Sequence, residues 1–431
     1  MKRENEHINE IQSETQNETT KVKSKQGKSK MGDKEQYEDD YPEYCRNRLM
    51  DFVKTKEINI EICDVTLRDG EQTPGVAFSK EQKMSIAQHL DNIGLEVIEA
   101  GFPVVSDAEK DVVKAIANMG LNAKVCCLCR STQKDVETAV DCDVDFVSIF
   151  LAMSDLHLKY KYHKSLDEML DVAMNAVEYA KDHGIGVRFA AEDATRTPVP
   201  RLIEAFKMAE ERKADYVSIA DTIGILNPTT ATYLVDQIYN ALDKKTKICM
   251  HCHDDLGLAV ANTLAAAEAG AFQLHTTVNG IGERAGNAAL EEVLMNLRIQ
   301  YGVDRYDLHT LVDLSEQVRK ASKIDIAVNK SVVGQNAFSH ESGIHVAAIL
   351  ENPRTYELFL PEMVGGKRNL IVGKHTGTKA LAGIIKSFGY ELKDDDFNTL
   401  FDRVKVITET ELRSIERDEL EMLIQGVLKG S

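Results

Sequence analysis

Two histidines separated by a single residue form the strongest candidate site in this sequence. His251 and His253 lie in the run MHCHDDLG at residues 250–257. Side chains two residues apart on a strand point to the same face, and two imidazoles on one face suit a single metal ion. Asp69, in the run TLRDGEQ at residues 66–72, would complete a His, His, Asp set that leaves coordination positions for a chelating substrate and water. A structural ion pair with Arg68 is the alternative reading of Asp69.

Four further polar residues lie on or directly after other predicted strands: Glu99, Arg188, Glu192 and Thr222. Each alone is weak evidence, because an acid at a strand end is often part of a structural ion pair. Together with Arg68 they outline a polar cavity that contains two arginines and a bound cation. Such a cavity fits a multiply charged oxo acid.

A glycine-rich run, NGIGERAGN at residues 279–287, follows the last predicted strand and precedes a predicted helix. Glycines let the backbone approach a ligand, and the N–H groups of such a turn favour anions. The run is not a dinucleotide fingerprint, because position 285 is alanine and the last strand of a barrel precedes it. A plain turn is the alternative. The residues of this candidate anion loop are Gly280, Gly282, Glu283, Arg284 and Asn287.

Elements that could position these residues alternate regularly from Ile58 onward. The predicted strands are 58–64, 97–102, 123–128, 146–151, 187–191, 216–220, 247–253 and 273–278. Predicted helices between them include 79–93, 167–183, 200–212, 228–242 and 257–269. Eight strand-helix units predict an α/β fold, a TIM (β/α)8 barrel, whose chemistry clusters at the C-terminal strand ends. A doubly wound open sheet would have fewer strands and a glycine-rich first turn, which this sequence lacks.

The chain divides into three predicted segments. Residues 1–45 are polar and lack aliphatic periodicity, which predicts a disordered tail with a lysine cluster between residues 21 and 30. Residues 46–300 form the predicted barrel, and residues 301–431 keep a mostly helical pattern. Gly/His-rich runs interrupt that pattern at 339–345 and 365–377.

Composition narrows the possible partners and compartment. The 431 residues include 52 Lys+Arg and 70 Asp+Glu, a formal charge of −18, which argues against nucleic acid or an anionic membrane surface as the main partner. No apolar run approaches the ~20 residues of a membrane span, and the N-terminus has no apolar signal region. The 8 cysteines sit mostly in apolar runs and lack the spacing of a disulfide framework. These features predict a soluble cytoplasmic protein with reduced core thiols.

Three runs carry a resemblance to a known family. They are LRDGEQ at 67–72 with Lys83 eleven positions after its glutamine, HCHDD at 251–255, and GIGERAGN at 280–287. These runs resemble the signatures of the 2-isopropylmalate, homocitrate and citramalate synthase family. Its members are metal-dependent TIM-barrel acyltransferases that join acetyl-CoA to a 2-oxo acid. The resemblance extends from Ile58 to the C-terminus and implies acetyl-CoA as co-substrate, with the glycine-rich loop as a candidate CoA contact.

The resemblance also implies roles for the candidate residues. Asp69, His251 and His253 would bind a divalent metal, Mg, Mn or Zn, that chelates the carboxylate and carbonyl of the oxo acid. Arg68 would polarise that carbonyl and stabilise the developing alkoxide. Thr222 would hold the C1 carboxylate. The remaining pocket residues would be Gln72, Glu99 and Glu192.

A downstream run resembles the family segment that reaches the active site of a neighbouring subunit. This run is FSHESGIH at 338–345, together with Tyr356. His345 and Tyr356 would help to deprotonate the acetyl methyl group or to activate the hydrolytic water. A homodimer with shared active sites follows from the resemblance.

Arg188 bears on the choice of substrate. Homocitrate synthases resemble this chain in an arginine on strand five that reads the distal carboxylate of 2-oxoglutarate. A buried unpaired arginine would be costly beside an aliphatic substrate. Homocitrate synthases of lysine pathways have a histidine near Leu128, so leucine here implies a different distal contact and a pocket open to longer diacids. An internal carboxylate on Arg188 would instead favour isopropylmalate or citramalate synthesis.

Length and loop composition complete the comparison of alternatives. About 55 residues follow Gly377, so the chain resembles homocitrate synthases without an added regulatory domain, including those with which methanogenic archaea lengthen 2-oxo acids for coenzyme B. Lyases of the hydroxymethylglutaryl-CoA type resemble one another in a Cys-bearing glycine loop, and residues 282–284 here lack cysteine. We therefore expect a Claisen-type condensation of acetyl-CoA with 2-oxoglutarate, followed by thioester hydrolysis to homocitrate and CoA.

Overall fold

The computed structural model describes residues 49, 56–243 and 245–430. The predicted polar tail at 1–45, with its lysine cluster and Cys45, lies outside the described residues. The structure therefore bears on the predicted barrel and on the region that follows it.

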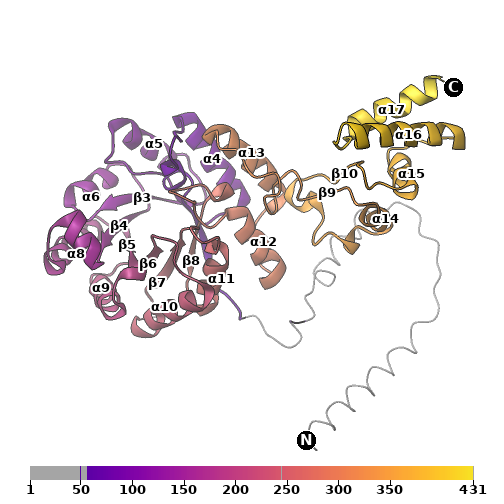
Figure 1. Cartoon of the computed structure of the whole chain (residues 1–431). Coiled ribbons are helices and arrows are strands. Elements are labelled where there is room, and N and C mark those ends of the chain that lie inside the picture. The colour runs from indigo at the N-terminus through magenta and orange to yellow at the C-terminus, as the bar shows by residue number, and fades with distance from the viewer. Residues whose placement is uncertain (1–48, 50–55, 244, 431) are drawn as a thin grey trace, which may run out of the picture. The chain divides into compact units, whose positions relative to one another are not determined.

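Eight parallel strands close into a barrel in the order β1 to β8 (Figure 1). They are β1 (Glu61–Asp64), β2 (Val97–Glu99), β3 (Lys124–Arg130), β4 (Phe146–Ala152), β5 (Gly186–Glu192), β6 (Tyr216–Asp221), β7 (Lys247–Cys252) and β8 (Gln273–Thr276). Pairing of β1 with β8, which sets Asp64 opposite Thr276, closes the ring. Each strand falls within or beside a predicted apolar run, so the predicted TIM barrel is confirmed.

Helices follow the strands around the barrel (Figure 1). They are α4 (Lys80–Ile93), α5 (Asp107–Ala117), α6 (Gln133–Val140), α8 (Leu166–Asp182), α9 (Val199–Glu211), α10 (Pro228–Ala241), α11 (Ala259–Ala269) and α12 (Leu290–Tyr301). Local chemistry fixes their ends: the Ser79 side chain accepts a hydrogen bond from the Gln82 backbone and starts α4, and Gly94 ends it at a φ of 95°. A short α7 (Asp155–His157) and the single turn η3 (Leu158–Tyr162) lie between β4 and α8.

The region after the barrel is mostly helical, as predicted, with helices α13 (Leu311–Ser322), α14 (Gly343–Glu351), α15 (Thr378–Ser387), α16 (Asp394–Thr410) and α17 (Arg417–Gly430). Two-residue strands β9 (Ser339–His340) and β10 (Asn369–Leu370) pair in parallel within the predicted Gly/His-rich interruptions. Val346, Leu381, Leu400 and Ile424 belong to a separate buried apolar cluster of this region. The exact borders of the three predicted segments stay predictions.

The seven cysteines of the described part are free and buried, which agrees with the expectation of reduced core thiols. Among the described helices, none combines the length and apolar character needed to span a bilayer.

Candidate metal centre and active site

A cavity of about 300 Å³ opens at the C-terminal ends of the barrel strands. Every strand, or the loop directly after it, contributes to its lining. Inward-facing residues alternate along the strands, as in the pairs Ser148 and Phe150 on β4 and Ser218 and Ala220 on β6. Most of the predicted site residues line this cavity, namely Arg68, Asp69, Gln72, Arg188, Glu192, Thr222, His251, His253, Glu283 and Arg284.

Asp69, His251 and His253 lie together in this cavity. Asp69 Oδ2 is 3.2 Å from His251 Nε2 and 3.9 Å from His253 Nε2. The two Nε2 atoms are 3.3 Å apart. All three side chains are buried. One ligand atom from each residue therefore faces the same small volume.

The chemistry of these atoms fits a divalent cation. His253 Nδ1 lies 3.2 Å from the Gly286 carbonyl oxygen, to which it can only donate, so Nε2 presents a lone pair to Asp69. Asp69 Oδ2 is buried and has no hydrogen-bond partner. Burial and the neighbouring His251 lower the pKa of His253 to about 4, so this imidazole is neutral at physiological pH. A neutral imidazole and a buried carboxylate whose ligand atoms converge are a set that suits a divalent cation.

Electrostatics keep Asp69 ionised. Burial alone would raise the pKa of the Asp69 carboxyl, but Arg68 and His251 outweigh burial and hold it well below its usual range. Arg68 Nη1 lies 3.0 Å from Asp69 Oδ1. Asp69 therefore forms the ion pair with Arg68 that was the alternative reading of the sequence. It also lies with His251 and His253 as a candidate metal ligand.

Glu99 lies beneath the cavity and accepts hydrogen bonds from both Arg68 and Arg188. Its side chain is fully buried. Burial would raise the pKa of Glu99, but the two guanidinium groups outweigh burial and lower it. Glu99 therefore acts as the common anion of the two arginines.

Arg188 is 1% exposed, and internal partners occupy its donors. Nε donates to Ser148 Oγ at 3.1 Å, and Nη1 donates to Gln273 Oε1 at 2.7 Å and to His275 Nε2 at 2.9 Å. Nη2 donates to Glu99. Arg188 thus has the internal carboxylate partner that we associated with isopropylmalate or citramalate synthesis.

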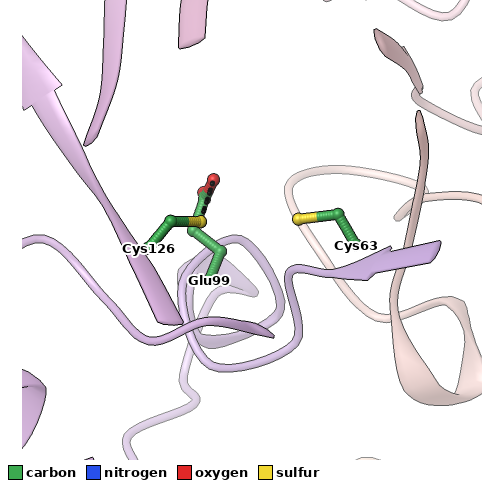
Figure 2. Close-up of side chains that lie close together, drawn as sticks. All are labelled: Cys63, Glu99 and Cys126. Atoms are coloured by element: carbon green, nitrogen blue, oxygen red, sulfur yellow. Dashed lines mark hydrogen bonds between the residues drawn. The ribbon is translucent and has the colours of Figure 1, made fainter. Parts of the chain in front are cut away.

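Cys63, Glu99 and Cys126 surround the same guanidinium. Figure 2 shows the thiol of Cys126 beside the Glu99 carboxylate and Cys63 facing them. Their ligand atoms lie within 4.8 Å of one another, as in a metal site. However, Arg188 Nη1 lies 3.4 Å from Cys63 Sγ and Nη2 lies 3.9 Å from Cys126 Sγ. The cation that Cys63, Glu99 and Cys126 bind in this structure is therefore the guanidinium of Arg188.

The glycine-rich run forms a tight loop after β8. Gly286 has a φ of 92°, and a Cβ there would lie 1.8 Å from the Gly280 carbonyl oxygen, so only glycine fits. Arg284 makes two 2.8 Å contacts with the Asp255 carboxylate and donates to the Thr222 carbonyl at 2.7 Å. Arg284 thus ties together the loops after β6, β7 and β8, and its contact with an anionic ligand stays a prediction. Gly280 and Asn287 line a neighbouring cavity of about 290 Å³.

His345 and Tyr356 lie outside the catalytic cavity. Their rings stack with centroids 3.9 Å apart, and both side chains are exposed. Among the described residues, those that line the cavity end at Arg284 in sequence. One chain therefore does not bring this pair together with the candidate metal ligands.

Sequence reasoning missed two titratable residues of the cavity, His275 and Lys161. His275 is on β8 and is buried, and burial lowers the pKa of its imidazole well below the usual value. The alternation of Gln273, Leu274 and His275 could have revealed it, since two polar residues flank one apolar residue as in His251 to His253. Lys161 comes from η3, a turn outside the strand-helix repeat, and no sequence pattern pointed to it.

The barrel with its polar, metal-compatible cavity at the strand ends is an enzyme architecture, and the chain belongs to the HMGL-like family, whose model matches residues 59–318. A second model, described as homocitrate synthase post-HMGL domain-like, matches residues 332–411.

Among curated proteins, the chain is 65% identical over 386 residues to homocitrate synthase AksA of Methanosarcina acetivorans, which covers 89% of this chain and 95% of that protein. Homocitrate synthase AksA of Methanosarcina mazei is 66% identical with the same coverage. The 2-isopropylmalate synthase of Methanocaldococcus jannaschii is 47% identical over 86% of this chain and 72% of that protein.

A solved structure shares the barrel. The HMG-CoA lyase of Bacillus subtilis superposes with a TM-score of 0.58 at 22% identity, covering 63% of this chain and 97% of that chain. At this identity the likeness concerns the fold alone.

Proposed function

We propose that this protein is a homocitrate synthase that converts acetyl-CoA, 2-oxoglutarate and water to homocitrate and CoA. One observation carries the proposal: the identity of 65–66% to two homocitrate synthases along 95% of their length. The geometry of the cavity supports it, because a trio of metal-compatible ligands and a guanidinium meet where a 2-oxo acid could enter.

Asp69, His251 and His253 would hold a divalent metal, which supplies Lewis-acid polarisation of the substrate carbonyl. Arg68 is 13% exposed at its side chain and lines the cavity beside Asp69. Its guanidinium would donate to the carbonyl oxygen as negative charge develops there during carbon–carbon bond formation. Glu99 holds the Nε side of Arg68, which aims the other nitrogens at the cavity.

Other cavity residues would orient the reactants. The Thr222 hydroxyl accepts a hydrogen bond from the Asp193 backbone at 2.8 Å, so its own proton is available to the C1 carboxylate. Gln72 Oε1 lies 3.4 Å from Arg68 Nη1 and would help to hold that guanidinium. Glu192 lines the cavity as a proton acceptor for the acetyl group or for water.

We further propose a cytoplasmic homodimer in which His345 and Tyr356 of one subunit complete the cavity of the other. Their mutual stacking and exposure support this arrangement, because an ordered, solvent-facing His-Tyr pair is available to a partner. Lengthening of 2-oxo diacids for coenzyme B is the pathway that we propose, since the cavity wall has a leucine at position 128, where homocitrate synthases of lysine pathways have a histidine.

The internal partner of Arg188 favours a second candidate, 2-isopropylmalate or citramalate synthesis. With its donors occupied, Arg188 does not stand in the cavity as an unpaired cation that demands an anionic substrate. The lower identity to the isopropylmalate synthase, 47%, and to (R)-citramalate synthase CimA of Methanocaldococcus jannaschii, 43%, weighs against this candidate.

A CoA-release assay separates the candidates. The purified full-length protein, acetyl-CoA and a divalent metal are combined with 2-oxoglutarate, 2-oxoadipate, 2-oxoisovalerate or pyruvate. We expect turnover of the diacids and little turnover of the two monoacids. A higher kcat/KM with 2-oxoisovalerate or pyruvate would overturn homocitrate synthesis and assign the second candidate. Cleavage of 3-hydroxy-3-methylglutaryl-CoA without any condensation would assign a lyase.

A further inference from the structure

His157 lies next to Glu192 and has no role in the function proposed above. It is the last residue of the short α7, which follows β4, and its side chain is 20% exposed. His157 Nε2 lies 3.6 Å from Glu192 Oε1. Glu192 lines the catalytic cavity, whereas His157 does not. The imidazole thus approaches a cavity carboxylate from outside the cavity lining and is itself open to solvent.

Asp193 fixes the orientation of the His157 ring. Burial would raise the pKa of the Asp193 carboxyl, but hydrogen bonds, chiefly with Arg196 and Ser154, outweigh burial and lower it. The ionised carboxylate can only accept a hydrogen bond, and its Oδ2 lies 2.9 Å from His157 Nδ1. Ser154 Oγ lies 3.0 Å from the same nitrogen. The neutral ring therefore carries its proton on Nδ1 and presents a lone pair on Nε2 toward Glu192.

Asp193 also prepares the ring to accept a charge. Its side chain is fully buried, so its negative charge is poorly screened by solvent. A buried aspartate on Nδ1 stabilises the imidazolium that forms when Nε2 takes up a proton, as in the Ser-His-Asp triad. Asp193 and Glu192 are consecutive in the chain, so the end of β5 supplies both carboxylates on either side of the imidazole.

Two basic side chains pair with the Glu192 carboxylate in the described part of the chain. Lys161 Nζ lies 2.6 Å and 2.8 Å from its two oxygens, and His157 is the second partner. The ammonium group already carries three protons and can only donate. Of the two partners, only His157 can therefore take a proton from Glu192. The 3.6 Å separation is longer than a hydrogen bond, but such contacts are often long without substrate and tighten when it binds.

The proposed reaction must release a proton from the cavity once per turnover. Condensation moves one proton from the acetyl methyl group to the new hydroxyl group, with no net release. Hydrolysis then breaks the thioester C–S bond, and water supplies OH to the acyl carbon and a proton to the sulfur. The carboxylic acid that forms ionises at neutral pH, because its pKa lies near 4. One proton per turnover thus remains to be carried to solvent.

We propose that His157 carries this proton from Glu192 to solvent. The Glu192 carboxylate accepts the proton from the hydrolytic water, and its new O–H bond breaks as Nε2 of His157 takes the proton. The imidazolium, paired with Asp193, then gives the proton to solvent, and both groups return to their starting states. His157 acts through Glu192 and does not touch the substrate. The inference rests on the proposed function and assigns the proton path of its hydrolytic step.

The test uses His157→Asn and His157→Ala in the full-length enzyme with metal, acetyl-CoA and 2-oxoglutarate. The asparagine amide can keep a donor on Asp193 but offers no proton acceptor in place of Nε2. His163→Asn is the matched control, since His163 is exposed on the same connection between β4 and α8 and does not line the cavity. We expect His157→Asn to lower kcat by roughly 10- to 100-fold, part of the contribution of acid–base catalysis, with KM for both substrates unchanged.

Chemical rescue separates proton transfer from a structural role. Added imidazole should raise kcat of His157→Ala in a saturable way, because the truncated side chain leaves room for a ring that can accept the proton. The same imidazole should not raise kcat of wild type or of His163→Asn, which also controls for binding of imidazole to the metal. Thermal melts of each variant show whether a loss of folding contributes.

Three results would overturn the inference. A wild-type kcat in His157→Asn would mean that His157 only ties α7 to Asp193. A loss of kcat that imidazole does not relieve would assign His157 a structural role, and a rise in KM with unchanged kcat would assign it to substrate binding. Failure of the proposed function is distinguishable, because it appears in wild type as turnover of a monoacid instead of 2-oxoglutarate. The His157 variants can then be measured with that monoacid, whose condensation and hydrolysis release the same proton.

Discussion

Glu99 and Arg188 form an ion pair in which both side chains are almost completely buried, although they come from non-adjacent strands, β2 and β5. The same Glu99 carboxylate also pairs with Arg68. A single anion therefore joins Arg68, which is expected to act at the carbonyl, with Arg188, the buried arginine of the cavity wall.

Replacing Glu99 with Gln should destabilise the fold strongly. The substitution keeps the shape but leaves the buried Arg188 guanidinium without its anion and removes one of the two carboxylate partners of Arg68. Breaking a buried pair costs about 3–5 kcal/mol. We expect a large fall in the free energy of unfolding, measured by denaturant titration. The double variant Glu99→Gln/Arg188→Met should lose less than the sum of the two single variants. Additive losses would show that the pair is not coupled.

A divalent metal should stabilise the folded protein through the histidine-aspartate trio. At 100 times its dissociation constant, a ligand that binds only the folded state adds about 2.7 kcal/mol. We expect Mn²⁺ to raise the melting temperature of wild type and of His183→Ala, whose ring hydrogen-bonds to the Tyr179 carbonyl and lies against the Tyr179 ring of the same helix. His251→Ala should show no such rise and no activity. A full metal-induced rise in His251→Ala would move the metal elsewhere.

Subunit sharing predicts complementation between two inactive variants. If His345 acts in the cavity of a partner, mixing Asp69→Asn with His345→Ala creates mixed dimers that contain one intact site. Random pairing should restore up to about a quarter of wild-type activity, since half of the dimers are mixed and each has one intact site. The measurement is CoA release after co-refolding or co-expression. Absence of any recovery, despite mixed dimers seen by mass spectrometry, would place both residues in one chain's site.

Asp64 should make stability depend on pH. Burial, with the charge of Glu291, raises the pKa of its carboxyl to about 7, against about 3.9 in an unfolded chain. The folded state thus retains a proton that the unfolded state releases, and this contribution to stability is lost as pH rises toward 7. Asp64→Asn removes the titration, so its stability relative to wild type should improve by about 2.6 kcal/mol between pH 5 and pH 8. Chemical unfolding at both pH values measures the change, and a constant difference would contradict the assignment.

The sequence predicted the barrel well because each strand and helix has its own local pattern. Strands such as 146–152 are apolar except for one serine, Ser148. Helices such as α4 and α10 begin at Ser79 and Asn227, whose side chains accept hydrogen bonds from backbone N–H groups of the first turn. The shared face of His251 and His253 likewise follows from strand alternation alone.

The partners of the cavity residues could not be predicted in the same way. Glu99 and Arg188 are 89 residues apart, and their contact depends on how eight strands tilt and close. Lys161 reaches the cavity only because η3 turns inward after β4, and no periodic pattern describes such a turn. Local sequence patterns thus specified the strands and helices. The closure of the barrel determined which charged side chains contact one another.

The guanidinium of Arg188 keeps metal ions from binding inside the barrel. Two thiols and a carboxylate converge on it, and thiolates with a carboxylate are a ligand set that soft metals such as zinc and cadmium bind tightly. The arginine occupies this position with a positive charge that cannot be released, so adventitious metals are kept out of the core. Neutral substitutions of Arg188 should therefore be purified with a chelator and their metal content measured. Otherwise an inhibitory ion in the barrel floor would be mistaken for a lost substrate contact.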